Sequence, residues 1–183
     1  MGSSGVINGV NLDRLIRIAT AFKAQPSLAR FRFRAENRWI GGGHSMTRVK
    51  DFYGAGREDS SREAAFEVHA DEPAVLLGDD QGANPIEHVL AALASCLTAS
   101  LVYHAAAGGI KVEEVESHLE GDLDVRGFLG LSLGVRKGYE RIRVKVRVKS
   151  DAPAEQLRAL MQDSPVYDMI SNPVPIFLEL EKK

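Results

Sequence analysis

The chain has 183 residues, of which 44% are hydrophobic, and its formal net charge is −2 at pH 7. This length corresponds to one domain, or one domain with an extension, and the apolar share is enough to build a sizeable core. The small net charge provides no long-range field for nucleic acid or for an anionic membrane surface. The single cysteine, Cys96, excludes an internal disulfide framework and is typical of a reducing compartment, so we expect a cytoplasmic protein.

Residues 11–23 carry apolar side chains at helical spacing, with Asp13 in the first turn and Pro26 after the end. We therefore expect an N-terminal helical extension over residues 1–27 and one domain over residues 28–183. The start of the chain has no basic region followed by a long apolar core, so we expect no secretory signal.

The next segments alternate between apolar and polar side chains and predict strands. Residues 31–40 lead into a Gly41-Gly42-Gly43 turn, and residues 45–51 then form the second arm of a predicted hairpin. Residues 53–62 are glycine-rich and charged, which favours a loop. Residues 63–70 predict a third strand, and residues 78–83 predict a second polar loop.

The segment NPIEHVLAALASCL opens a long predicted helix over residues 84–107. Asn84 suits the N-cap, Pro85 suits the first helical position, and Glu87 suits the position that bonds back to the cap. Gly108 and Gly109 predict the end. Both faces are apolar, so we expect a core helix buried on nearly all sides, rather than a membrane span. A second subunit is the simplest cover for such a helix in a chain of this length.

Two further strands are predicted after the long helix, at residues 115–125 and 139–149. The second presents five cations on one face, which suggests either a solvated face of an antiparallel sheet or a nucleic-acid surface. We favour the solvated face, because no aromatic side chains lie between the cations. The glycine-rich stretch 127–138 between them is either a plain hairpin connection or a mobile apolar flap.

The C-terminal part predicts a short helix capped by Asp151 and running to about Gln162, followed by SPVYD at residues 164–168 and a last strand at residues 176–181. The order of elements predicts an α+β fold with antiparallel sheets.

Cys96 is the first candidate for chemistry. A lone cysteine in an apolar helix is usually a small buried hydrophobe, and a reactive thiol needs a nearby cation, helix N-terminus or metal to lower its pKa. His88 and His104 each lie eight residues from Cys96, about two turns along the helix and about 80° around it, so neither can touch the thiol. The histidines show no HExxH-type spacing, and we expect neither a metal nor a cofactor.

The segments NPIEHVLAALASCL and SPVYDMISNPVPI resemble the family of osmotically inducible protein C and organic hydroperoxide resistance protein (OsmC/Ohr). The resemblance implies an intertwined homodimer with both central helices buried at the interface. It also implies a two-cysteine peroxidase cycle, in which the thiolate at the position of Cys96 attacks the peroxide. A second cysteine then closes a disulfide, which a dithiol reductant opens. In that family an arginine from the N-terminal strands activates the thiol, and a glutamate holds the arginine.

The sequence departs from this pattern at two positions. Ile86 stands where the family places its glutamate, and Glu87 is the next residue. Ser164 stands at the position of the second cysteine and cannot form a disulfide. Of the arginines near the early strands, Arg48 is preferred as the activating residue. The expected catalytic residues are therefore Cys96, Glu87 and Arg48; Arg38 and Arg57 remain alternatives to Arg48.

Two functions follow from the resemblance and the departures. The first is a single-cysteine, thiol-dependent organic hydroperoxide reductase for oxidative-stress defence, in which an external thiol reduces the oxidised Cys96. The alternative is a non-enzymatic homodimer that binds a small apolar ligand in a pocket at the dimer interface. Binding to nucleic acid through the cationic strand is the weakest hypothesis, and we expect no membrane partner.

Overall fold

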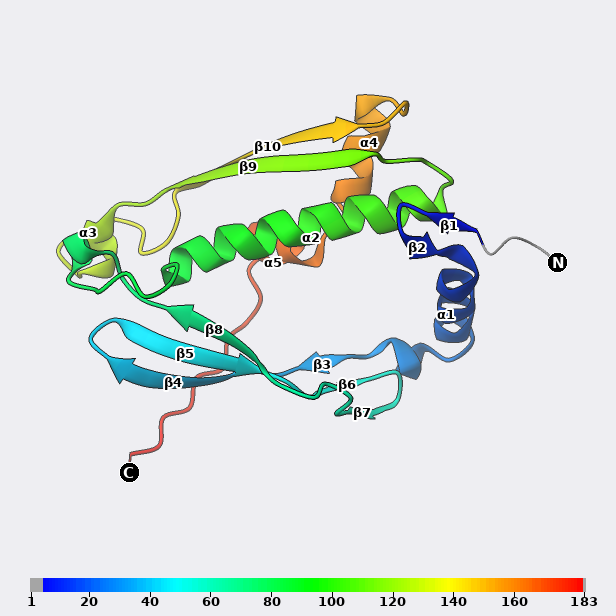
Figure 1. Cartoon of the computed structure of the whole chain (residues 1–183). Helices are drawn as coiled ribbons and strands as arrows, with labels where there is room; N and C mark the ends of the chain where they lie inside the picture. Colours follow the sequence, from blue (N-terminus) through cyan, green and yellow to red (C-terminus); the bar gives the residue numbers. More distant parts are fainter. Residues whose placement is uncertain (1–4, 183) are drawn as a thin grey trace. The chain divides into compact units, whose positions relative to one another are not determined.

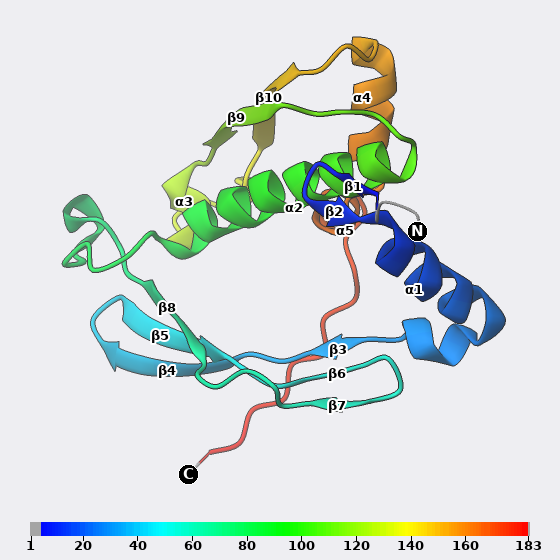
Figure 2. The same ribbon diagram turned by 45° about the vertical axis from the view of Figure 1, so that its right-hand side comes forward.

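The computed structural model describes residues 5–182 and separates into two compact units. The first comprises residues 11–89 with the stretch that ends at Val6, and the second comprises residues 7–10 and the chain from residue 90 onward. Figures 1 and 2 show the elements of each unit, which are described separately below.

The first unit contains two antiparallel three-stranded sheets, in the orders β3-β6-β7 and β4-β5-β8. Its helices and strands are α1 (Leu12–Ala24), η1 (Pro26–Ala29), β3 (Arg32–Phe33), β4 (Glu36–Gly41), β5 (His44–Val49), β6 (Phe52–Gly54), β7 (Arg57–Asp59), β8 (Phe66–Ala70) and η2 (Ala74–Leu76).

Helix α1 and the β4–β5 hairpin confirm the sequence predictions. The Asn11 Oδ1 atom accepts a hydrogen bond from the Arg14 backbone N–H at 2.8 Å, which caps α1. Strands β4 and β5 pair in antiparallel register, and β8 adds to the free edge of β5. The third predicted strand is therefore also confirmed.

The loop predicted over residues 53–62 is wrong, because β6 and β7 form a small hairpin there. The turn residues Ala55 and Gly56 both have left-handed backbone angles, with φ of 50° and 82°, as a tight two-residue hairpin turn requires. Gly54 is buried against Phe31, and an added Cβ at Gly54 would lie 2.3 Å from that ring. With three residues in each strand, the segment is too short to show an alternating pattern.

The second unit is built from the long helix α2 and an antiparallel hairpin of β9 and β10, whose nine residues all pair. Helix α2 begins with residues of the first unit and continues through the second. The bounds are α2 (Pro85–Ala107), β9 (Glu114–Asp122), α3 (Val125–Phe128), β10 (Arg141–Lys149), α4 (Ala154–Met161) and α5 (Pro165–Ser171).

A short N-terminal hairpin contributes to the second unit. Strands β1 (Val6–Ile7) and β2 (Val10–Asn11) form a two-stranded sheet. In the turn between them, the Asn8 side chain donates to the Ile110 carbonyl at 3.0 Å and accepts from the Val112 N–H at 2.8 Å. These two bonds fix the chain just after α2.

Helix α2 begins and ends as predicted. The Asn84 side chain accepts from the Glu87 N–H, and the Glu87 carboxylate accepts from the Asn84 N–H, both at 2.8 Å. These reciprocal bonds form a capping box. At the other end, the N–H groups of Gly109 and Ile110 donate to carbonyls of the last turn, and Gly109 adopts the left-handed φ of 72° that this ending uses.

Within the single chain only one face of α2 is buried, so the expected burial on nearly all sides, which included cover by a second subunit, stays a prediction. The buried positions recur every three or four residues: Leu93, Leu97, Ser100, Leu101, Ala105 and Ala106. By length and composition α2 is also apolar enough to cross a membrane, and about 33% of that stretch is buried. Its buried stripe is that of a core helix.

Four of the five cations of β10 lie opposite acidic side chains of β9, and Lys145 lies opposite His118, which favours the solvated-face interpretation. Arg143 pairs with Glu120 and Asp122, and Arg147 pairs with Glu116 at 2.6 Å. The hydrogen bonds from Arg143 hold the pKa of Asp122 and Glu120 below the usual carboxyl range. Acidic side chains therefore compensate Arg143, Arg147 and Lys149, and the outer face of this hairpin carries charges of both signs.

The stretch between β9 and β10 connects two paired strands, as the hairpin alternative predicted. It also contains the unpredicted short helix α3. The exposed fractions of Leu131 and Leu133 are 70% and 105%. This connection is therefore apolar at its surface.

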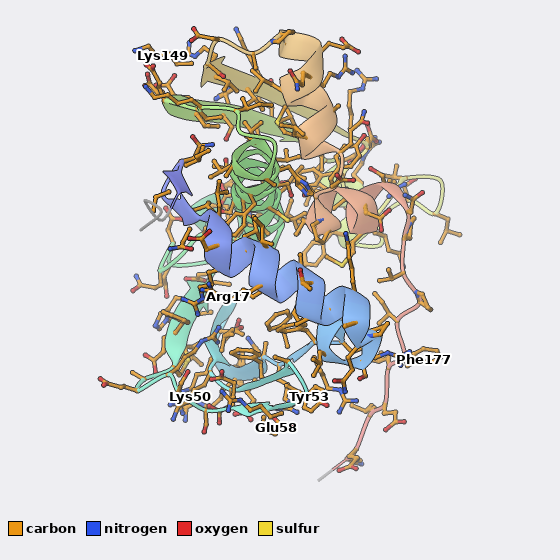
Figure 3. All side chains as sticks on the ribbon, turned by 90° about the vertical axis from the view of Figure 1, so that its right-hand side faces the viewer. Arg17, Lys50, Tyr53, Glu58, Lys149 and Phe177 are labelled. Atoms are coloured by element: carbon orange, nitrogen blue, oxygen red, sulfur yellow. The ribbon has the colours of Figure 1, made fainter. Side chains whose placement is uncertain are left out.

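Two predictions for the C-terminal part are wrong. Helix α4 begins at Ala154 with Pro153 at the N-cap position, so Asp151 does not cap it. Residues 172–182 form no helix or strand, and Phe177 is 91% exposed (Figure 3). A strand needs the free edge of another strand for its backbone hydrogen bonds, and within residues 5–182 this segment pairs with none.

Candidate functional site

Cys96 lies in the middle of α2, next to the buried stripe rather than within it. Leu97 is 7% exposed, and Cys96, one position earlier, is turned from it by about 100° and is half-buried. The neighbouring Ser95 hydroxyl donates back to the Ala91 carbonyl at 2.8 Å, so it is occupied within the helix. Cys96 is thus a free thiol on a face of α2 that the chain only partly covers.

The other residues expected at the site are divided between the two units. Ser164 belongs to the second unit together with Cys96, whereas Arg48 and Glu87 belong to the first.

Ser164 is fully buried and caps α5. Its Oγ accepts a hydrogen bond from the Tyr167 N–H at 3.2 Å, and Pro165 occupies the first position of the helix. Ser164 was predicted only as the residue at the position of the family's second cysteine, and its capping role was not predicted. The signal was present in SPVYD, because serine followed by proline is a typical helix start and Asp168 falls in the first turn.

Arg48 lies on β5 between two acidic neighbours. It is directly opposite Glu36 on β4 and Glu67 on β8, and its Nε lies 3.7 Å from the Glu67 Oε1. Its side chain is 56% exposed. The positive charge is therefore already partly compensated within the first unit.

Glu87 is engaged as the reciprocal partner of Asn84 in the capping box of α2. This contact accounts for a carboxylate at this position.

Of the alternative arginines, Arg38 lies opposite Met46 on the β4–β5 hairpin, and Arg57 starts β7.

A pair of histidines in the first unit was missed by the sequence analysis. His44 on β5 and His69 on β8 approach within 2.9 Å, from Nε2 to Nδ1. They are 25 residues apart and meet because β5 pairs with β8, so no local motif signals them. Within residues 5–182, no group of three or more histidine, cysteine, aspartate or glutamate side chains is arranged to hold a metal.

Asp71, next to the histidine pair, organises the loop before α2. It is 1% exposed and accepts hydrogen bonds from the backbone N–H groups of Glu72, Asp79 and Gln81. Burial alone would raise the pKa of Asp71, but these three hydrogen bonds and the nearby His44 outweigh it, so the pKa lies below the usual range.

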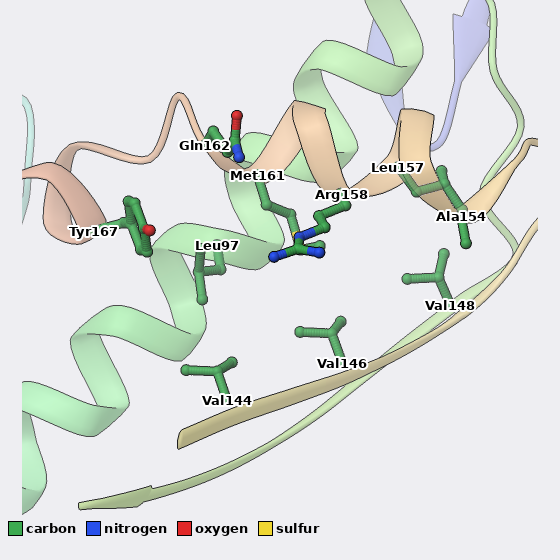
Figure 4. Close-up of a pocket in the computed structure, with 10 residues that line it drawn as sticks. All are labelled: Leu97, Val144, Val146, Val148, Ala154, Leu157, Arg158, Met161, Gln162 and Tyr167. Atoms are coloured by element: carbon green, nitrogen blue, oxygen red, sulfur yellow. The ribbon is translucent and has the colours of Figure 1, made fainter. Parts of the chain in front are cut away.

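The second unit also contains an open cavity of about 590 Å³ bordered by α2, β10, α4 and α5 (Figure 4). Val144, Val146 and Val148 of β10 form one wall. Leu97 of α2 contributes to the lining, and Arg158 and Met161 of α4 lie opposite the valines. The cavity thus adjoins the helix that carries Cys96.

Comparisons with known proteins agree with this architecture. The profile of the family described as OsmC-like protein matches residues 78–179, which is more than half of the chain. No curated protein gives a significant match.

Several solved structures share the fold at low sequence identity. An OsmC-like protein from Mycoplasma pneumoniae superposes with a TM-score of 0.58 at 13% identity, over 78% of this chain and 89% of that one. An OsmC-like protein of unknown function from Vibrio cholerae gives 0.55 at 15% identity, over 78% and 93%. An organic hydroperoxide resistance protein, OsmC, from Legionella pneumophila gives 0.51 at 16% identity, over 77% and 90%.

The structural similarity supports the α+β fold with antiparallel sheets that the sequence predicted. The profile match covers the capped start of α2, Cys96 and the Ser164 helix cap in one continuous segment. On these grounds, the chain belongs to the OsmC-like protein family.

Proposed function

We propose that this protein is a single-cysteine, thiol-dependent organic hydroperoxide reductase with Cys96 as the nucleophile. The observation that carries the proposal is the position of Cys96, twelve residues after the capping Asn84 on a helix inside the family match. The similar Legionella pneumophila protein bears the name organic hydroperoxide resistance protein, which suggests the substrate class.

The reaction proceeds in two steps. The Cys96 thiolate attacks the distal peroxide oxygen, the O–O bond breaks, and the alkoxide leaves as an alcohol after taking up a proton. Cys96 is thereby oxidised to a sulfenic acid. An external thiol then forms a mixed disulfide with Cys96 and releases water, and a second thiol restores the Cys96 thiol and leaves as the oxidised disulfide.

The external thiol is required because Ser164 occupies the place of the second cysteine. Its buried hydroxyl caps α5 and offers no sulfur for an internal disulfide. Arg48 is proposed as the cation that favours the thiolate and Glu87 as the carboxylate that orients it. Both already have other partners, Glu67 and Asn84 respectively.

The decisive experiment measures consumption of cumene hydroperoxide by the purified full chain with dithiothreitol as reductant. Cys96→Ser should abolish turnover, and wild-type protein treated with peroxide and dimedone should gain one adduct by intact mass. Arg48→Gln should lower the second-order rate of Cys96 oxidation, whereas the matched Arg38→Gln should not. Absence of both adduct and turnover in the wild-type protein would refute the proposal.

A variant tests the proposed place of Ser164 independently of turnover. Ser164→Cys should form an internal disulfide with Cys96 after peroxide treatment, detected by intact mass before and after alkylation. Ser132→Cys, in the connection between β9 and β10, serves as the matched control and should remain reduced at the new site.

We also propose that the protein acts as a homodimer. The uncovered faces of α2 and the apolar segment after α5 support this, because Tyr103 is 55% exposed and Leu178 is 91% exposed. Sedimentation equilibrium should give twice the chain mass; a monomer at micromolar concentration would contradict the proposal.

The boundary between an extension at residues 1–27 and the domain at residues 28–183 stays a prediction.

The second candidate is a non-enzymatic protein that binds a small apolar ligand. Ile86 and Ser164, which replace the expected glutamate and second cysteine, favour it. A dimeric wild-type protein that binds octane but shows no peroxide turnover would select this function over the first.

A further inference from the structure

One cation stands on the apolar face of an otherwise amphipathic helix. In α4, Ala154, Leu157, Arg158 and Met161 recur at the spacing that places side chains on one helix face, and all four line the cavity of the second unit. Three of these residues are apolar. The fourth, Arg158, is exposed to solvent and presents its guanidinium to the open cavity (Figure 4).

The cavity has the size and lining of a small-molecule site. Its volume of about 590 Å³ falls within the range of about 300–1,000 Å³ that ligand pockets occupy. The three inward valines of β10 extend over roughly 13 Å of strand and form an apolar wall. A hydrocarbon chain can lie along this wall without leaving a polar group unpaired.

In the part of the chain that the structure describes, Arg158 has no partner of opposite charge. Within residues 5–182, its guanidinium makes no hydrogen bond and no ion pair. The ten residues that line the cavity include no aspartate and no glutamate. The other polar lining groups, the Gln162 amide and the Tyr167 hydroxyl, are neutral. The lining therefore contains one positively charged group and no negatively charged group to balance it.

We propose that this cavity binds an amphiphile with a carboxylate head group and a hydrocarbon chain. The carboxylate pairs with Arg158, whose planar guanidinium matches a carboxylate through two parallel hydrogen bonds. The hydrocarbon chain lies against Val144, Val146 and Val148. Binding at this site does not require Cys96 chemistry. The binding experiments therefore test this proposal independently of the peroxidase proposal.

The test is isothermal titration calorimetry of the full chain with octanoate, octanol and octylammonium, each below its micellar concentration. Octanoate should bind at least about tenfold more tightly than octanol, because a hydrogen bond to a charged group adds this much selectivity. Octylammonium should bind most weakly, since its charge repels Arg158. Equal affinity for octanoate and octanol, or no saturable binding of octanoate, would overturn the proposal.

Variants locate the site. Arg158→Gln should remove the preference for octanoate and leave octanol binding unchanged, whereas Arg141→Gln, on the outer face of β10, should retain the preference. Val146→Trp fills the apolar part and should weaken octanoate and octanol alike, with thermal unfolding as the folding check. Loss of the preference in Arg141→Gln, or its retention in Arg158→Gln, would place the carboxylate elsewhere. The same titrations on Cys96→Ser should match the wild-type protein.

Discussion

The capping box of α2 provides a quantitative test of the role of Glu87. Glu87→Ala removes the hydrogen bond that the carboxylate accepts from the Asn84 N–H at 2.8 Å, and it also removes a negative charge from the first helical turn. Loss of the bond costs about 1 kcal/mol, and loss of the charge costs about 0.3–1 kcal/mol. We therefore expect the free energy of unfolding to fall by about 1–2 kcal/mol.

Thermal and urea unfolding measure this change. For a chain of this size, Tm should fall by roughly 2–4 °C for each kcal/mol lost. Glu155→Ala is the matched control, because Glu155 also lies in a first helical turn but the N-cap of α4 has no side-chain cap hydrogen bond. It should show only the smaller charge contribution, about 0.3–1 kcal/mol.

Glu87→Gln separates the structural role from a catalytic one. Glutamine keeps an acceptor for the Asn84 N–H, so this variant should lose less stability than Glu87→Ala. If Glu87→Ala is no more destabilising than Glu155→Ala, the capping argument is refuted. If Glu87→Gln unfolds like the wild-type protein but no longer reduces hydroperoxide, Glu87 acts on the chemistry.

Three other predictions concern buried groups. Because the pKa of Asp71 is lowered in the folded state, its contribution to stability is present above the usual carboxyl pKa of about 4 and is lost as pH falls through the lowered value. Urea unfolding against pH should show a shallower acid slope for Asp71→Asn than for the wild-type protein, and an unchanged slope would contradict this role. Ser164→Ala removes the cap of α5 and should cost about 1 kcal/mol in urea unfolding; no change would contradict the capping role. Leu101→Ala, at a fully buried position of α2, should cost about 2–5 kcal/mol, and a loss below about 1 kcal/mol would show that this face is not core.

Local rules explain which parts of the fold the sequence predicted. Asn84 was predicted as a helix cap because its side chain bonds to a backbone group three positions away, which a short window of sequence reveals. The alternation along β10 was equally visible, because nine residues are enough to establish a period of two.

The missed elements are short or depend on distant partners. The β6–β7 hairpin has three residues in each arm, and Gly54 enters it because Phe31 approaches closely. The last predicted strand has a suitable composition, yet a strand exists only where an edge is available. Pattern alone does not supply that edge.

The candidate site residues also divide into those within contiguous motifs and those that depend on distant partners. Cys96 and Ser164 were identified because they lie in contiguous motifs. The pairing of His44 with His69 follows from strand register, which the local pattern does not specify. Arg158 belongs to no contiguous motif, and it faces the cavity only because α4 packs near β10 in the folded chain.

The exposed segment after α5 has a consequence for aggregation. Its longest uninterrupted apolar run is Ile176-Phe177-Leu178, with Pro175 before it and Glu179 after it. Amyloid-forming windows typically need about six or seven residues of high β-propensity, low charge and no proline. Pro175 and Glu179 therefore act as gatekeepers, because they keep the apolar run shorter than the window that fibril formation requires.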